Sequence, residues 1–234
     1  MSDNKTPPAS TTTQAMDWFL QQASNLPQRR DSQARAGGRL LFALDATASR
    51  QASWDRACHL QAQMFLASDH LGGLELQLCY YQGFHQFYAS PWLRDSQSLL
   101  RTMNAVQCLG GHTQLERVLD HGLQEHAAKP IQAIIIIGDA IEEDLHRLYD
   151  KAGKLGLYGL PLFMFQEGQD ATVRQGFQKM AHLSKGAYAA FDERSAAELA
   201  DLLGAVATYT SGGFDALQQL RSASAHYLLQ QLKG

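Results

Sequence analysis

The sequence has little cysteine, and this scarcity excludes two classes of protein. Its three cysteines, Cys58, Cys79 and Cys108, lie far apart among 234 residues and form no CxxC pair. They support neither a disulfide framework nor a cysteine zinc site, and scattered thiols of this kind are typical of the reducing cytosol. We therefore expect Cys58 and Cys79 to be buried as small hydrophobic residues.

Long apolar runs and an excess of basic charge are also missing. No stretch approaches the roughly 18 consecutive apolar residues of a membrane span, so membrane insertion is not expected. The first 13 residues are polar and lack the apolar centre of a signal peptide. The net charge is −3, whereas nucleic-acid binding usually requires a basic patch. We predict a cytoplasmic protein that does not bind nucleic acid.

Several common enzyme signatures are absent as well. The sequence has no GxxxxGK[ST] phosphate loop, no GxSxG nucleophile elbow and no HExxH zinc helix. The pair Gly110-Gly111 alone is not a dinucleotide fingerprint. With 45% hydrophobic and 18% charged residues, the chain has the composition of a globular protein. None of these features predicts an enzyme.

What the sequence does contain is an alternation of strand and helix patterns. Strands are predicted by apolar or alternating runs at 39–45, 74–81, 84–89, 133–137, 160–165 and 186–191. Helical patterns occur at 53–68, 95–104, 171–183, 195–209 and 214–232. Two more helices are predicted, one from the glycines at 110–111 to about 128 and one after 139 with an acidic first turn at 142–144. Such alternation implies parallel pairing with right-handed crossovers. We therefore predict an α/β fold with a doubly wound, mostly parallel central sheet, one antiparallel edge strand and helices on both faces.

This predicted fold occupies the middle of the chain. Residues 1–13 are rich in Ser, Thr and Pro and are predicted to be a disordered tail, followed by a short helix and linker at 14–36. The central domain is predicted to span 37–210. An amphipathic helix within 211–234 is then expected to pack on or beside that domain.

Five oxygen-bearing side chains are predicted to meet at one end of the sheet. Asp45, Thr47 and Ser49 follow the apolar run of the first strand, and Asp139 ends a β-branched run. Thr113 lies in the glycine turn that opens a helix. Doubly wound sheets bind ligands at the carboxyl ends of their strands. Because carboxylates and hydroxyls suit Mg²⁺, Mn²⁺ or Ca²⁺ better than zinc, these residues predict a divalent-cation site.

The segments that carry these residues, DATAS, GGHTQL and IIIIGDA, resemble the three metal loops of the von Willebrand factor type A (vWA) domain. That family's metal-ion-dependent adhesion site (MIDAS) is written Asp-x-Ser-x-Ser, then a Thr, then an Asp. Mapped by motif, its positions fall on Asp45, Thr47, Ser49, Thr113 and Asp139. The resemblance covers roughly residues 37–210. It departs from the family at Thr47, where Ser is usual, and at Ala140, where glycine often follows the acid.

The resemblance implies protein binding rather than turnover. In the family, neutral hydroxyl ligands leave the bound dication with uncancelled positive charge, and a carboxylate from a partner protein completes its coordination. For this chain, the resemblance implies a module that binds another protein's acidic side chain through Mg²⁺, or through Mn²⁺ or Ca²⁺. The partner's identity and the oligomeric state are not encoded in any pattern of the sequence.

Two other interpretations stay open from the sequence. In a haloacid-dehalogenase-like phosphatase, Asp45 would be the nucleophile and Asp139 with Asp144 would hold Mg²⁺. However, Thr47 stands where that family has its general acid. A metal-free interaction domain of the same fold is the second alternative. The acids at 142–144 are interpreted as surface charges that complement a helix dipole, not as ligands.

Overall fold

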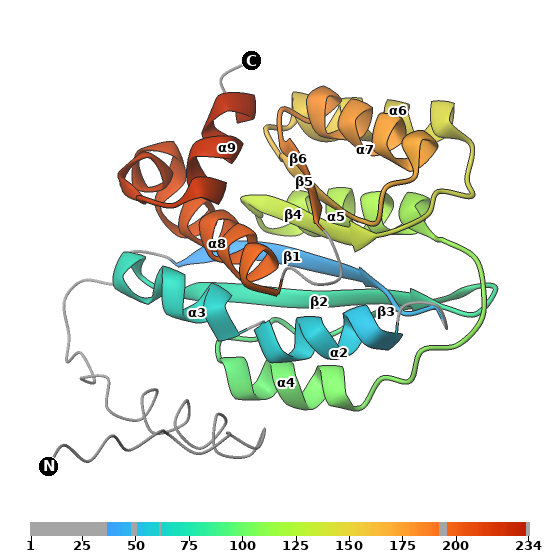
Figure 1. Ribbon diagram of the computed structural model, residues 1–234, viewed down its shortest axis with the longest axis horizontal. Coiled ribbons are helices and arrows are strands. Elements are labelled where there is room, and N and C mark those ends of the chain that lie inside the picture. The colour runs from blue at the N-terminus through green and yellow to red at the C-terminus, as the bar shows by residue number, and fades with distance from the viewer. Residues whose placement is uncertain (1–36, 48–50, 61, 192–195, 233–234) are drawn as a thin grey trace, which may run out of the picture. The chain divides into compact units, whose positions relative to one another are not determined.

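A computed structural model describes residues 37–47, 51–60, 62–191 and 196–232. Within these ranges, six strands form one sheet in the order β3-β2-β1-β4-β5-β6 (Figure 1). In chain order they are β1 Gly38–Asp45, β2 Leu74–Gln82, β3 Gln86–Ala89, β4 Ala133–Gly138, β5 Leu162–Glu167 and β6 Ala187–Phe191. All neighbouring strands are parallel except β2 and β3, whose antiparallel hairpin places β3 at an edge. The predicted fold class is confirmed.

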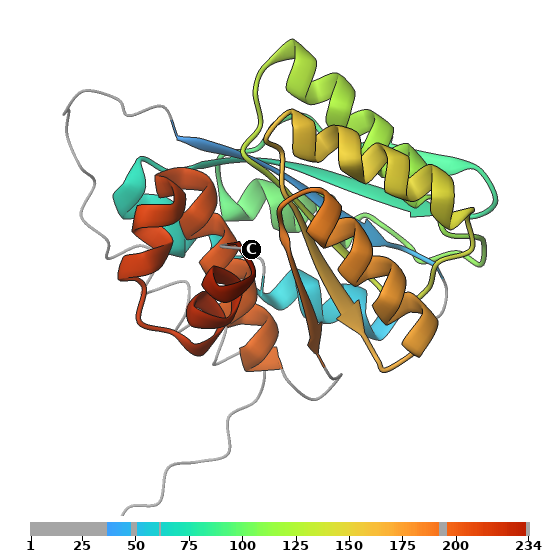
Figure 2. The ribbon, with the colours of Figure 1, turned by 90° about the horizontal axis from the view of Figure 1, so that it is seen from above.

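Helices cover both faces of this sheet (Figure 2). They are α2 Gln51–Leu60, α3 Ala62–Ser68, α4 Ser96–Asn104, α5 Leu115–Ala128, α6 Leu145–Leu157, α7 Ala171–Leu183, α8 Ala196–Gln219 and α9 Ala223–Leu232, with a 3-10 turn, η2, at Asp69–Leu71. α5, α6 and α7 pack on one face, and α2, α3, α4 and α8 pack on the other. None of the helices in the described ranges combines the length and apolar character that a bilayer crossing requires.

β1 lies in the middle of the sheet because its residues 40–44 are apolar toward both faces. Every residue of this strand is buried, and so is every residue of its neighbour β4. The register sets Asp45 beside Tyr81 of β2 and Leu44 beside Ile137 of β4. Continuous apolar strands of this kind are typical of parallel sheets covered by helices on both sides. Since β1 and β4 are adjacent and parallel, their carboxyl ends open at the same edge of the sheet.

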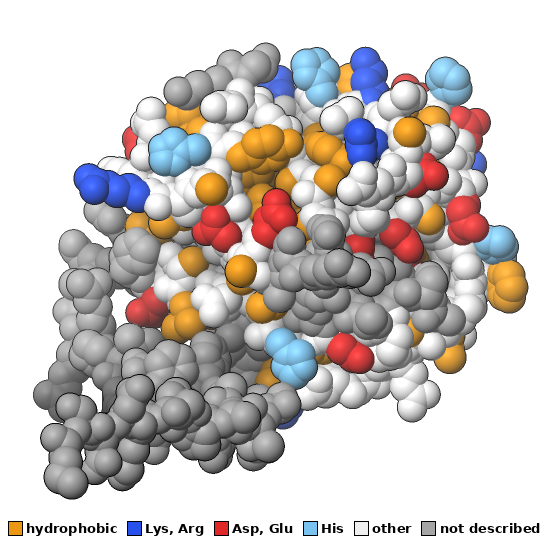
Figure 3. Space-filling model, in the orientation of Figure 1, with side chains coloured by type: hydrophobic (Ala, Val, Ile, Leu, Met, Phe, Trp, Pro, Cys, Tyr) orange, Lys and Arg blue, Asp and Glu red, His pale blue; other side chains and the backbone are white. Residues whose placement is uncertain are grey.

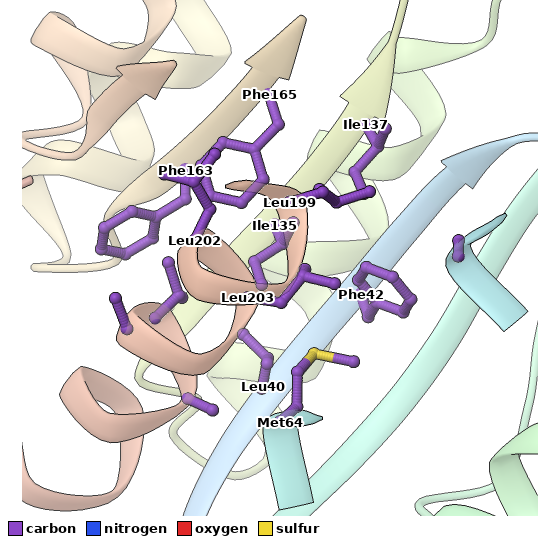
Figure 4. Packing of buried hydrophobic residues seen from close by; sticks show 14 of the residues in the cluster. Leu40, Phe42, Met64, Ile135, Ile137, Phe163, Phe165, Leu199, Leu202 and Leu203 are labelled. Atoms are coloured by element: carbon purple, nitrogen blue, oxygen red, sulfur yellow. The ribbon is translucent and has the colours of Figure 1, made fainter. Parts of the chain in front are cut away.

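Alternate side chains of the strands enter two separate hydrophobic cores. On one face, Phe42 and Ile135 pack with Met64 of α3 and Leu203 of α8 (Figure 4). On the other face, α5, α6 and α7 cover the sheet, with Phe177 fully buried. Burial of each large apolar side chain contributes roughly 1.5–3 kcal/mol to stability. The two cores therefore hold the strand ends, and the loops that leave them, in fixed positions.

The two cysteines predicted to be buried are indeed inside. Cys58 is 6% exposed and Cys79 is fully buried. Burial raises the pKa of the Cys58 thiol to about 12. This thiol is therefore protonated at neutral pH and behaves as a small hydrophobic group.

Helix boundaries differ from the prediction near the end of the chain. The helix predicted at 53–68 corresponds to α2 and α3, and residue 61 between them lies outside the described residues. The helix predicted at 195–209 extends slightly further, to a kink at Gly213 (φ 72°, ψ −166°) that divides α8 into two helical segments. The interruption predicted between residues 209 and 214 is therefore present. The tail, helix and linker predicted for residues 1–36 lie outside the described residues.

The helix predicted at 214–232 is divided, because its first part is the segment of α8 that follows the Gly213 kink and α9 begins only at Ala223. Two caps fix this break. The Ser222 hydroxyl accepts the N–H of Ala225 at 3.1 Å, and the Asp201 carboxylate accepts the N–H of Ser224 at 3.1 Å. The amphipathic period continues through the break, so the pattern alone does not reveal it.

Candidate metal centre

The carboxyl ends of β1 and β4 open into a small polar hollow. Its volume is about 190 Å³, and it is lined by Asp45, Thr47, Gly110, Gly111, Thr113, Asp139, Ala140 and Glu142. Four of the five predicted metal ligands therefore meet at one place, from three loops. The second of the three loops consists of residues 108–113 and is called the glycine loop below. The fifth predicted ligand, Ser49, lies outside the described residues.

Asp45 ends β1 with only 3% of its surface exposed. Its Oδ1 atom accepts the N–H of Thr47 at 2.7 Å, which turns the chain directly after the strand. The intervening Ala46 holds the turn on two sides. Its N–H donates to the Tyr81 carbonyl at 2.9 Å, and its own carbonyl accepts the N–H of Leu109 at 3.0 Å. The first loop is thereby fixed against both β2 and the glycine loop.

Gly111 permits close contact between the glycine loop and the β2–β3 hairpin. A Cβ atom at this position would lie 2.0 Å from the carbonyl oxygen of Gly83, so a larger residue does not fit without a backbone shift. The N–H of His112 donates to that same oxygen at 3.2 Å. The His112 ring also packs edge-on against Phe84, with 5.2 Å between ring centroids. This contact sets the position of Thr113, the next residue in the loop.

Thr113 is only 6% exposed, and its side chain is held by the loop that follows β4. Its hydroxyl donates to Glu143 Oε2 at 2.6 Å and accepts the N–H of Glu142 at 3.0 Å. The Glu143 carboxylate also accepts the N–H of Leu115, the first residue of α5. Gln114, at the N-cap position of α5, makes no side-chain capping bond. Glu143 therefore caps this helix from a different loop.

The acids at 142–144 do not form the first turn of a helix, and this part of the prediction is wrong. α6 begins after these acids, and of the three only Asp144 caps it, as its N-cap residue. Glu143 caps α5, and Glu142 lines the hollow. The prediction assigned these carboxylates to the nearest helix in the chain. The signal that would have found them is that the loop after Asp139 must lie at the same sheet edge as the other ligand loops.

Glu142 lies at the rim of the hollow, with 46% of its side chain exposed. Its Oε2 atom accepts the N–H of Thr113 at 2.7 Å and lies 3.2 Å from His112 Nδ1. The Thr113 N–H lowers the pKa of the Glu142 carboxyl below its ordinary value, because it stabilises the charged form. Glu142 is therefore an ionised carboxylate at neutral pH.

The donors of the hollow fit a hard divalent cation. Asp45 and Asp139 offer carboxylate oxygens, and Thr47 and Thr113 offer hydroxyls, which are the donors that Mg²⁺ and Ca²⁺ prefer. In the described parts of the chain, no three His, Cys, Asp or Glu side chains lie close enough together to hold an ion by themselves. An ion here would therefore depend on the hydroxyls.

Comparison with known proteins finds similarity of fold without similarity of sequence. No family model and no curated protein matches the chain. The solved VWA domain of SpRpn10 has a TM-score of 0.55 and 12% identity, over 76% of this chain and 98% of that one. The vWF domain of the type V pili tip protein Mfa5 from Porphyromonas gingivalis has a TM-score of 0.54 and 11% identity, over 74% and 95%. Proximal thread matrix protein 1 from the mussel byssus, with a zinc-occupied MIDAS motif, has a TM-score of 0.57 and 11% identity, over 74% and 47%.

These similarities show that the chain has a vWA-like fold, and they confirm the resemblance in fold predicted from the sequence. One structure of this fold holds a divalent ion at its MIDAS motif. At identities this low the comparison establishes the fold alone, and the function has to be argued from the site.

Proposed function

We propose that this protein is a divalent-cation-dependent module that binds an acidic side chain of a partner protein. The observation that carries the proposal is the meeting of Asp45, Thr47, Thr113 and Asp139 in one polar hollow of a vWA-like fold. Ser49, two residues beyond Thr47, is proposed as the fifth ligand. No single one of these residues would support the proposal, since each alone is common in turns and caps.

The residues of the hollow would hold the ion in two ways. Asp45 and Asp139 would compensate its charge, and the hydroxyls would supply neutral oxygens. The Thr113 hydroxyl is already oriented for this role, because its proton goes to Glu143 and one lone pair accepts the N–H of Glu142. A second lone pair is left for a cation. When bound, the ion would supply the positive charge that attracts a partner's carboxylate.

We propose Mg²⁺ as the ion, with Mn²⁺ or Ca²⁺ as substitutes that use the same oxygen donors. Zinc is bound at the MIDAS motif of the mussel protein. In this chain, no His or Cys is among the residues that line the hollow. Because zinc sites in proteins usually include nitrogen or sulfur ligands, the oxygen donors here favour the harder ions.

We propose no catalytic reaction for the site. A phosphatase of the haloacid-dehalogenase type would need a general acid two residues after Asp45, and this chain has Thr47 there. A threonine hydroxyl does not supply a proton in that role.

Isothermal titration of the full chain with MgCl₂ and with MnCl₂ tests the metal site. We expect saturable binding that EDTA reverses. If no heat of binding is found up to millimolar ion, the metal site is rejected, and the metal-free interaction domain becomes the better hypothesis.

A pull-down with and without chelator tests the partner. We expect acidic partners to be retained in Mg²⁺ and released in EDTA, with identification by mass spectrometry. A partner that is retained equally in both buffers would contradict an ion-mediated contact.

A further inference from the structure

Glu142 adds a third carboxylate to the hollow, beside Asp45 and Asp139. The vWA pattern matched in the sequence has acids only at the other two positions. A dication and two carboxylates sum to zero charge, and a third carboxylate makes the hollow negative. A partner's acid that approaches the ion would therefore meet a like charge at the rim, which weakens its binding.

Glu142 and Glu143 are neighbours in the chain but are held to different degrees. The Glu143 carboxylate is bound by the Thr113 hydroxyl and by the N–H of Leu115 at the start of α5. The Glu142 carboxylate uses a single oxygen, Oε2, for its contacts with the Thr113 N–H and the His112 ring. With its side chain 46% exposed, Glu142 can rotate into solvent at the loss of these contacts. Glu143 has no such freedom, because its departure would uncap α5.

We propose that Glu142 is a resident carboxylate whose negative charge at the rim opposes the binding of the partner's acid at the proposed ion site. This inference rests on the proposed function, since it requires an ion in the hollow. In the unbound protein Glu142 stays on the Thr113 N–H at the rim. When the partner's carboxylate arrives, Glu142 turns toward solvent and the repulsion is relieved. Glu142 therefore sets the affinity for acidic partners without being one of the five ligands.

The test uses the full chain loaded with Mn²⁺, and acetate as the carboxylate probe. Water-proton relaxation reports the water on the bound Mn²⁺, and acetate that reaches the ion lowers it. In Glu142→Gln, acetate should act at about tenfold lower concentration than in the wild type, because a like charge beside the ion is removed. Gln keeps an oxygen acceptor for the Thr113 N–H, so the loop should retain its geometry.

Glu198→Gln is the matched control, because Glu198 is an exposed acid of α8 that does not line the hollow. It should respond to acetate as the wild type does. Glu142→Ala, as a second variant, should match Glu142→Gln, and circular dichroism checks that both are folded. Equal acetate sensitivity of the wild type and both Glu142 variants would overturn the inference. So would loss of Mn²⁺ from folded Glu142 variants, which would make Glu142 a permanent ligand. A wild-type chain that binds no Mn²⁺ would instead reject the proposed function itself.

Discussion

Two hollows in the described part of the molecule differ greatly in size, and the smaller one holds the candidate site. The larger is a groove of about 920 Å³ along β6, between α7 on one side and α8 and α9 on the other. Figure 3 shows hydrophobic side chains gathered between α9 and α7, with acidic side chains over α8. The smaller is the polar hollow of about 190 Å³ at the ends of β1 and β4. Size alone would select the groove as the ligand site.

Polar side chains of the groove, however, are used to hold the fold together. The Asp201 carboxylate accepts the N–H of Ser224 at 3.1 Å, and the Tyr188 hydroxyl donates to Gln166 Oε1 at 2.6 Å. The Gln231 amide bonds both the N–H and the carbonyl of Tyr188, each at 2.9 Å, and so covers part of the open edge of β6. In the small hollow, oxygen donors from three loops meet instead at one place. The contrast teaches that the meeting of donors, rather than volume, identifies this site.

The largest expected effect is a loss of Mn²⁺ affinity when one carboxylate is removed from the small hollow but not when one is removed from the groove. Asp45→Asn should lower the affinity for Mn²⁺ by more than about 100-fold, because loss of a second-shell partner already costs about 10–100-fold. Asn keeps an oxygen for the Thr47 N–H, so the fold should persist. Asp201→Asn in the groove should leave the Mn²⁺ affinity unchanged. Titration calorimetry measures the Mn²⁺ affinity of both variants, and circular dichroism checks that both are folded. If Asp45→Asn and Asp201→Asn bind Mn²⁺ equally well, the distinction between the two hollows is lost.

A backbone substitution in the glycine loop should have the next largest effect. Gly111→Ala places a Cβ 2.0 Å from the Gly83 oxygen. It should lower the free energy of unfolding by about 2 kcal/mol, as other overpacked substitutions do. The Mn²⁺ affinity should also fall, because Thr113 moves with the loop. Urea denaturation measures the first change, and calorimetry measures the second.

Gly110→Ala is the control for this substitution. A Cβ at Gly110 has no neighbouring atom within 4 Å, so the free energy of unfolding should change by less than about 0.5 kcal/mol. If both alanine variants are equally destabilised, the contact with Gly83 is not what holds the glycine loop.

The capping acids give a smaller effect and separate metal binding from stability. Glu143→Gln should lower the free energy of unfolding by about 1 kcal/mol, since it removes the charge that caps α5. It should also weaken Mn²⁺ binding about tenfold, because the Thr113 hydroxyl loses its charged acceptor. Asp144→Asn, which caps only α6, should not change Mn²⁺ affinity. If the two variants bind Mn²⁺ equally well, Glu143 has no part in the site.

Much of the fold was predictable because single residue patterns dominate it. The β-branched run at 133–137 predicts a strand covered on both faces, and β4 is buried throughout. The strand ends at Asp45 and Asp139 predict a common edge, since parallel strands deliver their carboxyl ends to the same side. Their meeting with Thr113 also depends on the strand order, with β1 beside β4, which the alternation of strands and helices does not specify. The part of Ser49 in the site stays a prediction.

The sequence-based prediction was wrong where the hydrogen-bond partner of a side chain lies on another helix or strand. Glu143 follows the usual preference for acids near a helix start, but the helix that it caps is α5, not the adjacent α6. The break between α8 and α9 is a similar case. Asp201 of α8 caps the start of α9, whereas the amphipathic pattern continues through the break. Both contacts join residues more than 20 positions apart. Local patterns do not contain such information.

The smallest expected effect tests whether the groove is independent of the hollow. Gln231→Ala removes both hydrogen bonds that tie α9 to Tyr188 of β6, so the free energy of unfolding should fall by about 1 kcal/mol. Gln230→Ala, at an exposed neighbour on the same helix, should change it by less than about 0.5 kcal/mol. The Tyr188 amide should exchange its hydrogen faster only in the first variant, and both should bind Mn²⁺ as the wild type does. A loss of Mn²⁺ affinity in Gln231→Ala would mean that the two hollows are coupled, and the contrast between a groove that serves the fold and a hollow that serves a ligand would fail.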